Sequence, residues 1–128
     1  MDKKITFKIA MLPVTENHAV AMSKRGGYKT KKYKEWEEFA LLTLQEKVIK
    51  KSEWYKASIV FHLPLYYKNG NVRRKDAHNM IKYAIDTILH NKVRDSEGNE
   101  IDDKRIISGE WKKVDDEDMW TEITFECV

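Results

Sequence analysis

Residues 76–89 read DAHNMIKYAIDTIL, and this stretch has the periodicity of an amphipathic helix. Its apolar residues recur every three or four positions and therefore share one face of a helix with 3.6 residues per turn. Asn79, Lys82 and Asp86 line up along a polar edge of the same helix. We predict a helix over about residues 77–90 with one buried face, formed by Ala77, Ile81, Ala84, Ile85 and Ile88.

Strand patterns flank this helix on both sides. Apolar and polar residues alternate over residues 5–11, which is the period of a half-buried strand. Further segments rich in β-branched and aromatic residues, bounded by turn residues, have the composition of strands. We predict these strands over about residues 57–63, 105–113 and 119–127.

A second helix, of about 18 residues, is predicted after Thr30 from an apolar stripe that runs from Tyr33 to Val48. Residues 14–30, 65–75 and 91–100 are predicted loops, because glycines and charged residues interrupt any period there. The order of elements is β-α-β-α-β-β. It predicts an α/β (α+β) fold with two layers, a four-stranded mixed sheet packed against two helices, in one domain over residues 1–128.

Length and composition exclude several classes of protein. The chain has 128 residues, 41% of them hydrophobic and 11% aromatic, which is enough for one core and too apolar for disorder. Cys127 is the one cysteine, so no internal disulfide forms, and no stretch approaches the roughly 20 apolar residues of a membrane span. The sequence contains no P-loop, GxGxxG, Cys/His zinc or GxSxG motif. We expect a soluble, cytoplasmic, globular protein.

Charge is distributed unevenly along the chain. Residues 1–75 contain 17 Lys and Arg against 7 Asp and Glu, a net charge of +10, whereas residues 76–128 contain 7 against 14, a net charge of −7. Such asymmetry is typical of proteins that bind polyanions or hold metals with carboxylates, and solvation alone is the alternative. The candidate phosphate contacts are Lys24, Arg25, Lys29, Lys31, Lys32, Arg73, Arg74 and Lys75.

Two acidic segments are candidates for one site: Asp76, at the start of the predicted helix, and Asp102-Asp103, after the long turn. A helix of about 14 residues is roughly 21 Å long, and residues 91–101 can extend over roughly 36 Å, so the chain can return Asp103 to Asp76. Carboxylates brought so close repel one another unless a cation lies between them, and oxygen ligands suit Mg²⁺. A divalent metal site is the resulting hypothesis.

The same residues also have purely structural interpretations. Asp76 is a suitable helix N-cap, Lys82 and Asp86 are spaced for a surface ion pair, and Asp102-Asp103 fits an ordinary turn. The aromatic residues Tyr83, Trp111 and Trp120 are interpreted as packing residues, and no role is assigned to His18, His62 or His90.

The pattern Asp76-x-x-Asn79-x-x-Lys82-x-x-x-Asp86, followed by Asp102-Asp103, resembles the signature of RusA-type Holliday-junction resolvases, which are often encoded by phages or prophages. The resemblance covers nearly the whole chain. It implies a homodimeric, Mg²⁺-dependent endonuclease that cuts symmetrically across a four-way DNA junction.

The resemblance also implies roles for individual residues. Asp76 and Asp103 match the catalytic carboxylates, Lys82 matches the catalytic lysine, and Asn79 and Asp86 match supporting positions. The implied metal ligands are Asp76, His78, Asp102 and Asp103. His78 stands where the family usually has a second aspartate, and the turn before Asp102 is longer than usual. A neutral imidazole suits Mn²⁺ better than Mg²⁺.

Two alternative functions are compatible with these residues. A junction-binding protein whose metal site has lapsed would keep the basic surface without cutting DNA. A small interaction domain with no nucleic-acid role would fail to bind DNA at any salt concentration.

Overall fold

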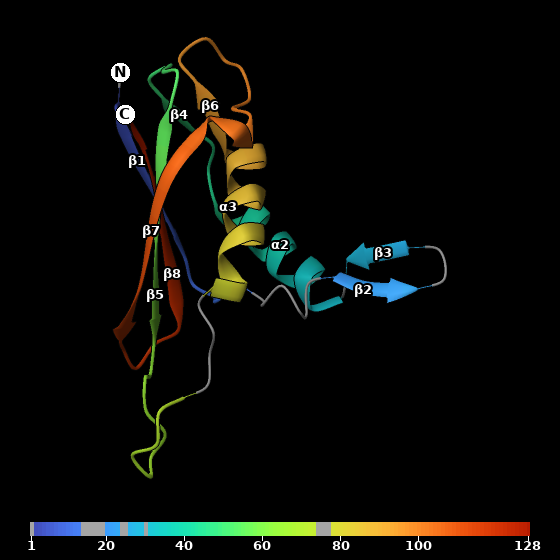
Figure 1. The fold of residues 1–128 in the computed structure, drawn as a ribbon, viewed down its shortest axis with the longest axis vertical. Coiled ribbons are helices and arrows are strands. Elements are labelled where there is room, and N and C mark those ends of the chain that lie inside the picture. Colours follow the sequence, from blue (N-terminus) through green and yellow to red (C-terminus); the bar gives the residue numbers. More distant parts are fainter. Residues whose placement is uncertain (1, 14–19, 24–25, 30, 74–77) are drawn as a thin grey trace.

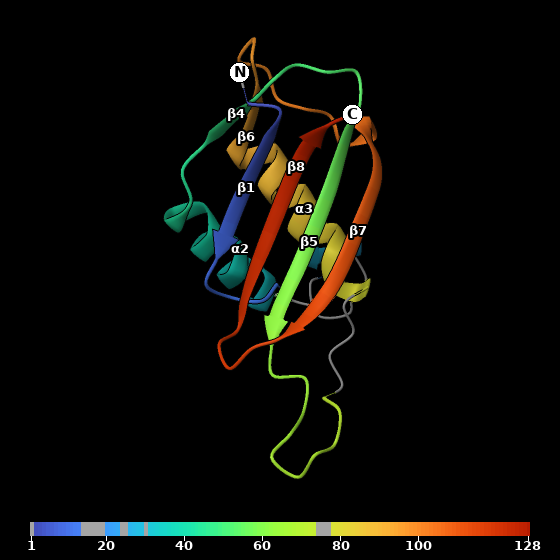
Figure 2. The same ribbon diagram turned by 90° about the vertical axis from the view of Figure 1, so that its left-hand side faces the viewer.

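The main sheet has four strands in this computed structural model, which describes residues 2–13, 20–23, 26–29, 31–73 and 78–128. β8 (Trp120–Cys127) pairs antiparallel with both β1 (Lys4–Ile9) and β5 (Tyr55–Leu63). β7 (Ile106–Asp115) pairs parallel with the other side of β5. The spatial order is β1-β8-β5-β7, so the sheet is mixed, which confirms the predicted fold class (Figure 2).

Two helices among the described residues lie against one face of this sheet (Figure 1). They are α2 (Lys31–Thr43) and α3 (His78–Lys92). Odd-numbered residues of β5 are buried and even-numbered ones are half-buried, as a strand with one covered face requires. The helices contribute Trp36, Ala40, Ala84 and Ile88 to the core, which confirms the predicted stripes at these positions. Neither helix has the length and apolarity to cross a membrane.

Helix α2 is shorter than the sequence pattern predicts. It ends at Thr43, whose hydroxyl donates to the Phe39 carbonyl at 2.8 Å, and the chain then enters β4 (Lys47–Ile49). β4 pairs in parallel with β6 (Val93–Asp95). The prediction of about 18 residues was therefore wrong at its C-terminal end. Pairing with β6 satisfies the backbone of β4 and buries Ile49 completely, whereas Val48 is exposed.

The predicted loop over residues 14–30 contains a small hairpin instead. β2 (Val20–Ser23) and β3 (Gly26–Lys29) pair antiparallel and project away from the sheet on the helix side (Figure 1). The glycines at positions 26 and 27 weaken a strand but do not prevent a short ladder of backbone hydrogen bonds, so the prediction of a loop was wrong for these two segments.

The connection from α3 to β7 folds back along the helix. The Asp95 carboxylate accepts hydrogen bonds from the backbone N–H groups of Glu97 at 2.8 Å and Asn99 at 3.0 Å, which closes a tight turn. Ile101 is buried and anchors the returning chain, and the short 3₁₀ helix η1 (Asp103–Arg105) then leads into β7. Because β5 and β7 are parallel neighbours, α3 is the crossover helix between them. This arrangement brings Asp103 back beside α3.

Candidate functional site

The structure brings Asp86, His90 and Asp103 together. Asp86 and His90 are one turn apart on α3, and Asp103 is the first residue of η1. One potential ligand atom from each side chain lies within 4.8 Å of the corresponding atoms of the other two. Asp86 and His90 are half-buried and Asp103 is exposed, so the group is open to solvent on one side.

The position of Asp103 is set by its preceding residue. Asp102 caps η1, because its Oδ1 accepts from the Lys104 backbone N–H at 3.0 Å and its carbonyl accepts from the Arg105 N–H at 2.9 Å. Two hydrogen bonds lower the pKa of Asp102 below its ordinary value. The larger effect comes from the capping bond of the Lys104 backbone, and the smaller one from a hydrogen bond with the Asp103 side chain. The carboxylate of Asp102 is therefore turned toward its own backbone, while Asp103 lies against α3.

The electrostatics of the group centre on Asp86. Burial raises the pKa of the Asp86 carboxyl above its ordinary value, and the neighbouring carboxylate of Asp103 raises it further. The charges of His90 and Lys82 act in the opposite direction with smaller effect. A half-buried carboxylate beside a second one is a position where an additional positive charge would be stabilising.

His90 is a member of this group that the sequence analysis did not identify. Its Nδ1 lies 3.0 Å from Oε1 of Glu100, on the segment that returns toward η1. Its spacing of four residues from Asp86 was the available signal, because residues four apart share a helix face. That signal is weak in an isolated sequence, since many helices carry such pairs without a function.

Of the predicted catalytic residues, Lys82 and Asp103 lie within the described part of the chain and Asp76 does not. Lys82 is exposed, and its ammonium lies 5.5 Å from the centre of the Tyr83 ring. The backbone of His78 and Asn79 forms the start of α3, which puts His78 about 12 Å before Asp86 along the helix axis at 1.5 Å per residue. Asp76, and with it the predicted meeting of Asp76 with Asp103, lies outside the described residues.

The predicted phosphate contacts lie in three regions. Lys31 begins α2, is exposed, and has its ammonium 3.8 Å from Glu35. Arg73 precedes α3, and its guanidinium lies 5.0 Å from the centre of the Tyr67 ring. The backbones of Lys29 and Lys32 lie in β3 and α2. Lys24, Arg25, Arg74 and Lys75 lie outside the described residues.

A hollow adjoins the group of acidic residues. It has a volume of about 320 Å³ and is lined by His90, Glu100, Ile101 and Asp102. A larger open cleft of about 720 Å³ shares Glu100, Ile101 and Asp102 with it. Both hollows are open, and most of the residues that line them are polar or charged, which suits a charged, extended ligand better than a small apolar one.

A crossover helix that carries an Asp/His/Asp group on a mixed sheet defines a class of small α+β protein with a polar, metal-competent site. Residues 11–126 match the family model of the endodeoxyribonuclease RusA. The chain belongs to the RusA endodeoxyribonuclease family, which confirms the resemblance seen in the sequence. Comparison with curated proteins finds no match to this chain.

Proposed function

We propose that the protein is a divalent-metal-dependent endonuclease that resolves Holliday junctions or other branched DNA by paired phosphodiester hydrolysis. The observation that carries the proposal is the match to the RusA family over residues 11–126, with Asp86, His90 and Asp103 gathered on the matched segment. Paired cuts require two copies of the site, so we propose a homodimer as the working unit.

The residues of the group fit a divalent cation. Two carboxylates and an imidazole with ligand atoms within 4.8 Å of one another offer three donors on one side, and the open side leaves room for water or a phosphate oxygen. The imidazole favours Mn²⁺ or a similar ion over Mg²⁺, which prefers oxygen ligands. The family resemblance adds Asp76, His78 and Asp102 as proposed ligands. Because His78 begins α3 about 12 Å before Asp86 along the helix axis, we assign His78 and Asp76 to a second ion position rather than to the group of Asp86, His90 and Asp103.

The hydrogen bond between His90 and Glu100 supports this assignment. Metal-binding histidines characteristically donate their second ring N–H to a carboxylate or carbonyl, which fixes the ring orientation and tautomer. Glu100 lies 3.0 Å from Nδ1 of His90 and takes this position, so the assignment leaves Nε2 as the ligand atom.

The remaining chemistry is assigned to side chains near the group. Asp86, His90 and Asp103 would hold the divalent ion, which when bound would supply an activated water and neutralise charge on the scissile phosphate. Lys82, exposed one turn before Asp86 on α3, is proposed to stabilise the negative charge that develops on the phosphate. Lys31, Arg73 and the other basic residues hold the DNA backbone, and such contacts recognise shape rather than base sequence.

The test is cleavage of a labelled four-way junction in Mn²⁺, in Mg²⁺ and in EDTA, with a linear duplex of the same sequence as the control substrate. We expect symmetric nicks on the junction alone, and none in EDTA. Asp103→Asn should abolish cleavage with junction affinity retained, whereas Asp118→Asn, an exposed acid on the β7–β8 turn, should cut normally. If the natural protein binds the junction but makes no nicks in Mn²⁺ and none in Mg²⁺, the proposal is refuted in favour of a non-cutting junction binder.

A further inference from the structure

Residues 65–73, between β5 and α3, form a hairpin that extends beyond the end of the main sheet (Figures 1 and 2). Tyr67 donates its N–H to the Asn71 carbonyl at 2.7 Å, and Arg73 donates to the Leu65 carbonyl at 2.8 Å. Gly70, with φ of 87°, donates to the Tyr67 carbonyl at 2.9 Å and forms the turn at the tip. This segment, the tyrosine hairpin, is therefore an ordered projection with its own backbone hydrogen bonds.

The base of the tyrosine hairpin is fastened to the sheet. The Leu65 side chain packs against the core, and its N–H donates to Oδ1 of Asp115, the last residue of β7, at 3.0 Å. An anchored base holds the tip at a defined place relative to the rest of the molecule. It also means that substitutions at the tip leave the core contacts of the hairpin intact.

Two adjacent tyrosines of this hairpin are exposed. Tyr66 is 56% and Tyr67 48% exposed, although aromatic side chains are usually mostly buried. The Tyr66 backbone pairs with Val72 across the hairpin, and Val72 is also exposed, so neither tyrosine serves to close the core. Exposed aromatic rings on a hydrogen-bonded projection are typical of contact surfaces.

The charge of the tyrosine hairpin identifies the class of ligand. Residues 65–73 contain Lys68 and Arg73 and no acidic residue, and Arg74 and Lys75 follow directly in the sequence. The Arg73 guanidinium lies 5.0 Å from the centre of the Tyr67 ring. Aromatic rings beside cations are the combination with which proteins hold single-stranded nucleic acid, since the rings stack on bases while the cations contact phosphates.

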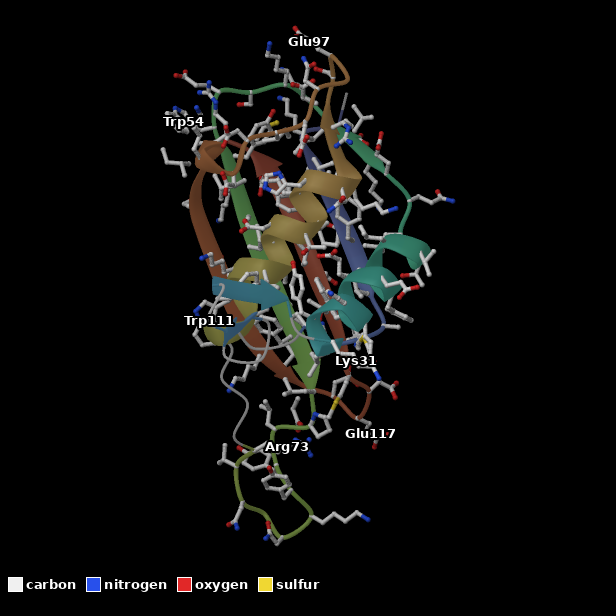
Figure 3. All side chains as sticks on the ribbon, turned by 90° about the vertical axis from the view of Figure 1, so that its right-hand side faces the viewer. Lys31, Trp54, Arg73, Glu97, Trp111 and Glu117 are labelled. Atoms are coloured by element: carbon white, nitrogen blue, oxygen red, sulfur yellow. The ribbon has the colours of Figure 1, made fainter. Side chains whose placement is uncertain are left out.

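A second exposed ring beside a cation, that of Trp54, has different surroundings. Trp54 is 37% exposed and has Arg105 at 5.7 Å from its ring, yet it lies at the opposite end of the molecule from Arg73 (Figure 3). Glu53 precedes it in the sequence. The tyrosine hairpin, by contrast, carries only positive charge and leads directly into the segment before α3.

We propose that the tyrosine hairpin binds unstacked DNA bases, with Tyr66 and Tyr67 stacking on the base faces that are exposed where the helical stack is interrupted at a branch point, while Lys68 and Arg73 contact the adjacent phosphates. The branch point as the source of these base faces rests on the proposed function, whereas stacking on unstacked bases does not. The hairpin thereby supplies discrimination between branched and continuous DNA, because a continuous duplex has no exposed base face along its length to offer.

The test uses the whole chain in EDTA, so that binding is measured without cleavage. The probe is 5-iododeoxyuridine, which cross-links to a stacked aromatic ring on irradiation, placed at the branch point of a four-way junction, in a single-stranded oligonucleotide, or within a linear duplex. We expect cross-links mapped by mass spectrometry to Tyr66 or Tyr67 with the junction and with the single strand, and none with the duplex.

Affinity measured by fluorescence anisotropy completes the test. The double variant Tyr66→Ala/Tyr67→Ala should bind the junction at least about fivefold more weakly, because stacking on one base is worth about 1–3 kcal/mol, and should bind the duplex as before. Tyr66→Phe/Tyr67→Phe should bind like the natural protein, since the rings remain. Leu42→Ala, which removes an exposed apolar side chain from the end of α2, is the control and should leave affinity unchanged.

The outcomes separate this inference from the proposed function. Cross-links to the two tyrosines with no cleavage in metal would refute the nuclease proposal and leave the hairpin assignment standing. Unchanged affinity of the double alanine variant, or cross-links only to other residues, would overturn the hairpin assignment even if the protein cuts junctions. Failure to bind the junction and the single strand would overturn both.

Discussion

Asp86 is the residue on which the proposed metal site depends most, because it is half-buried and beside a second carboxylate. We expect Asp86→Asn to weaken Mn²⁺ binding, measured by titration calorimetry, by more than about 100-fold, since losing even an outer partner of a ligand costs 10- to 100-fold. Glu100→Gln removes such an outer partner of His90 and should cost about 10- to 100-fold. Equal affinity in all three proteins would show that the ion binds elsewhere.

Asp116 is a residue where pH and stability are linked. Its carboxylate accepts from the backbone N–H of Asp118 and from Nε1 of Trp120, each at 3.0 Å, and lies 3.4 Å from Nδ1 of His62. These interactions hold the pKa of Asp116 below its ordinary value, and the hydrogen bond from the Asp118 backbone has the largest effect. A lowered pKa stabilises the folded protein at pH values above the unfolded pKa of about 3.9, and this stabilisation is lost as the pH falls through the folded pKa.

We therefore expect Asp116→Asn to lower the melting temperature by roughly a few degrees at pH 7, as a carboxylate acceptor is replaced by an amide. The difference from the natural protein should begin to narrow below about pH 3.9, where the Asp116 carboxyl group of the unfolded chain becomes neutral, and should close as the pH falls through the lower pKa of the folded protein. Thermal denaturation followed by circular dichroism at pH 7 and at pH 3 measures it. A difference that is the same at both pH values would contradict the assigned role of the charge.

The pairing of β5 with β7 depends on a glycine. A Cβ atom on Gly109 would lie 2.9 Å from the backbone carbonyl oxygen of Ala57, which is too close for an ordinary contact. We expect Gly109→Ala to lower the free energy of unfolding by about 1–3 kcal/mol, because β7 must shift away from β5. Gly98→Ala is the comparison in open space, where only its positive φ is strained. Urea denaturation distinguishes the two, and an unaffected Gly109→Ala protein would mean that β7 adjusts freely.

The two helices are joined by a buried hydrogen bond. The Tyr33 hydroxyl on α2 lies 2.7 Å from the Thr87 hydroxyl on α3, and burial raises the pKa of Tyr33 to about 12. Tyr33→Phe should lower the free energy of unfolding by about 1–3 kcal/mol, because the buried Thr87 hydroxyl loses a partner. Adding Thr87→Val should cost less than the sum of the single changes, and strict additivity would argue against coupling.

For the molecule as a whole, the uneven charge predicts a salt-dependent interaction with DNA. If Lys31 and Arg73 contact phosphates, the logarithm of the junction-binding constant should fall with the logarithm of the salt concentration. Replacing each by Gln should reduce that slope by about 0.9, as one condensed counterion fewer is released. Anisotropy titrations from low to high salt measure the slope, with Lys92→Gln on the last turn of α3 as the control. An unchanged slope would mean that both residues merely solvate the surface.

Much of the fold follows from patterns within short stretches. The alternation in β1 and the stripe of α3 were predicted correctly, because neighbouring residues along the chain decide which side of a strand or helix is apolar. The end of α2 was not, because Val48 fits the helical stripe and only pairing with β6, more than forty residues away, places it in a strand. Strands of three residues have no local signature strong enough to reveal their partners.

The candidate site, like the fold, has features that the sequence predicts and others that only contacts between distant residues decide. Asp86 and Asp103 could be selected from the sequence, since acidic residues in a family-like spacing are visible there, and so could the basic residues near Arg73. That Asp103 lies against Asp86 and His90 depends on the turn closed by Asp95, the burial of Ile101 and the parallel placement of β7 beside β5. These contacts join residues that are distant in the sequence. Their positions follow from packing of the whole chain, because no local preference of the residues between them specifies where the returning segment meets the helix.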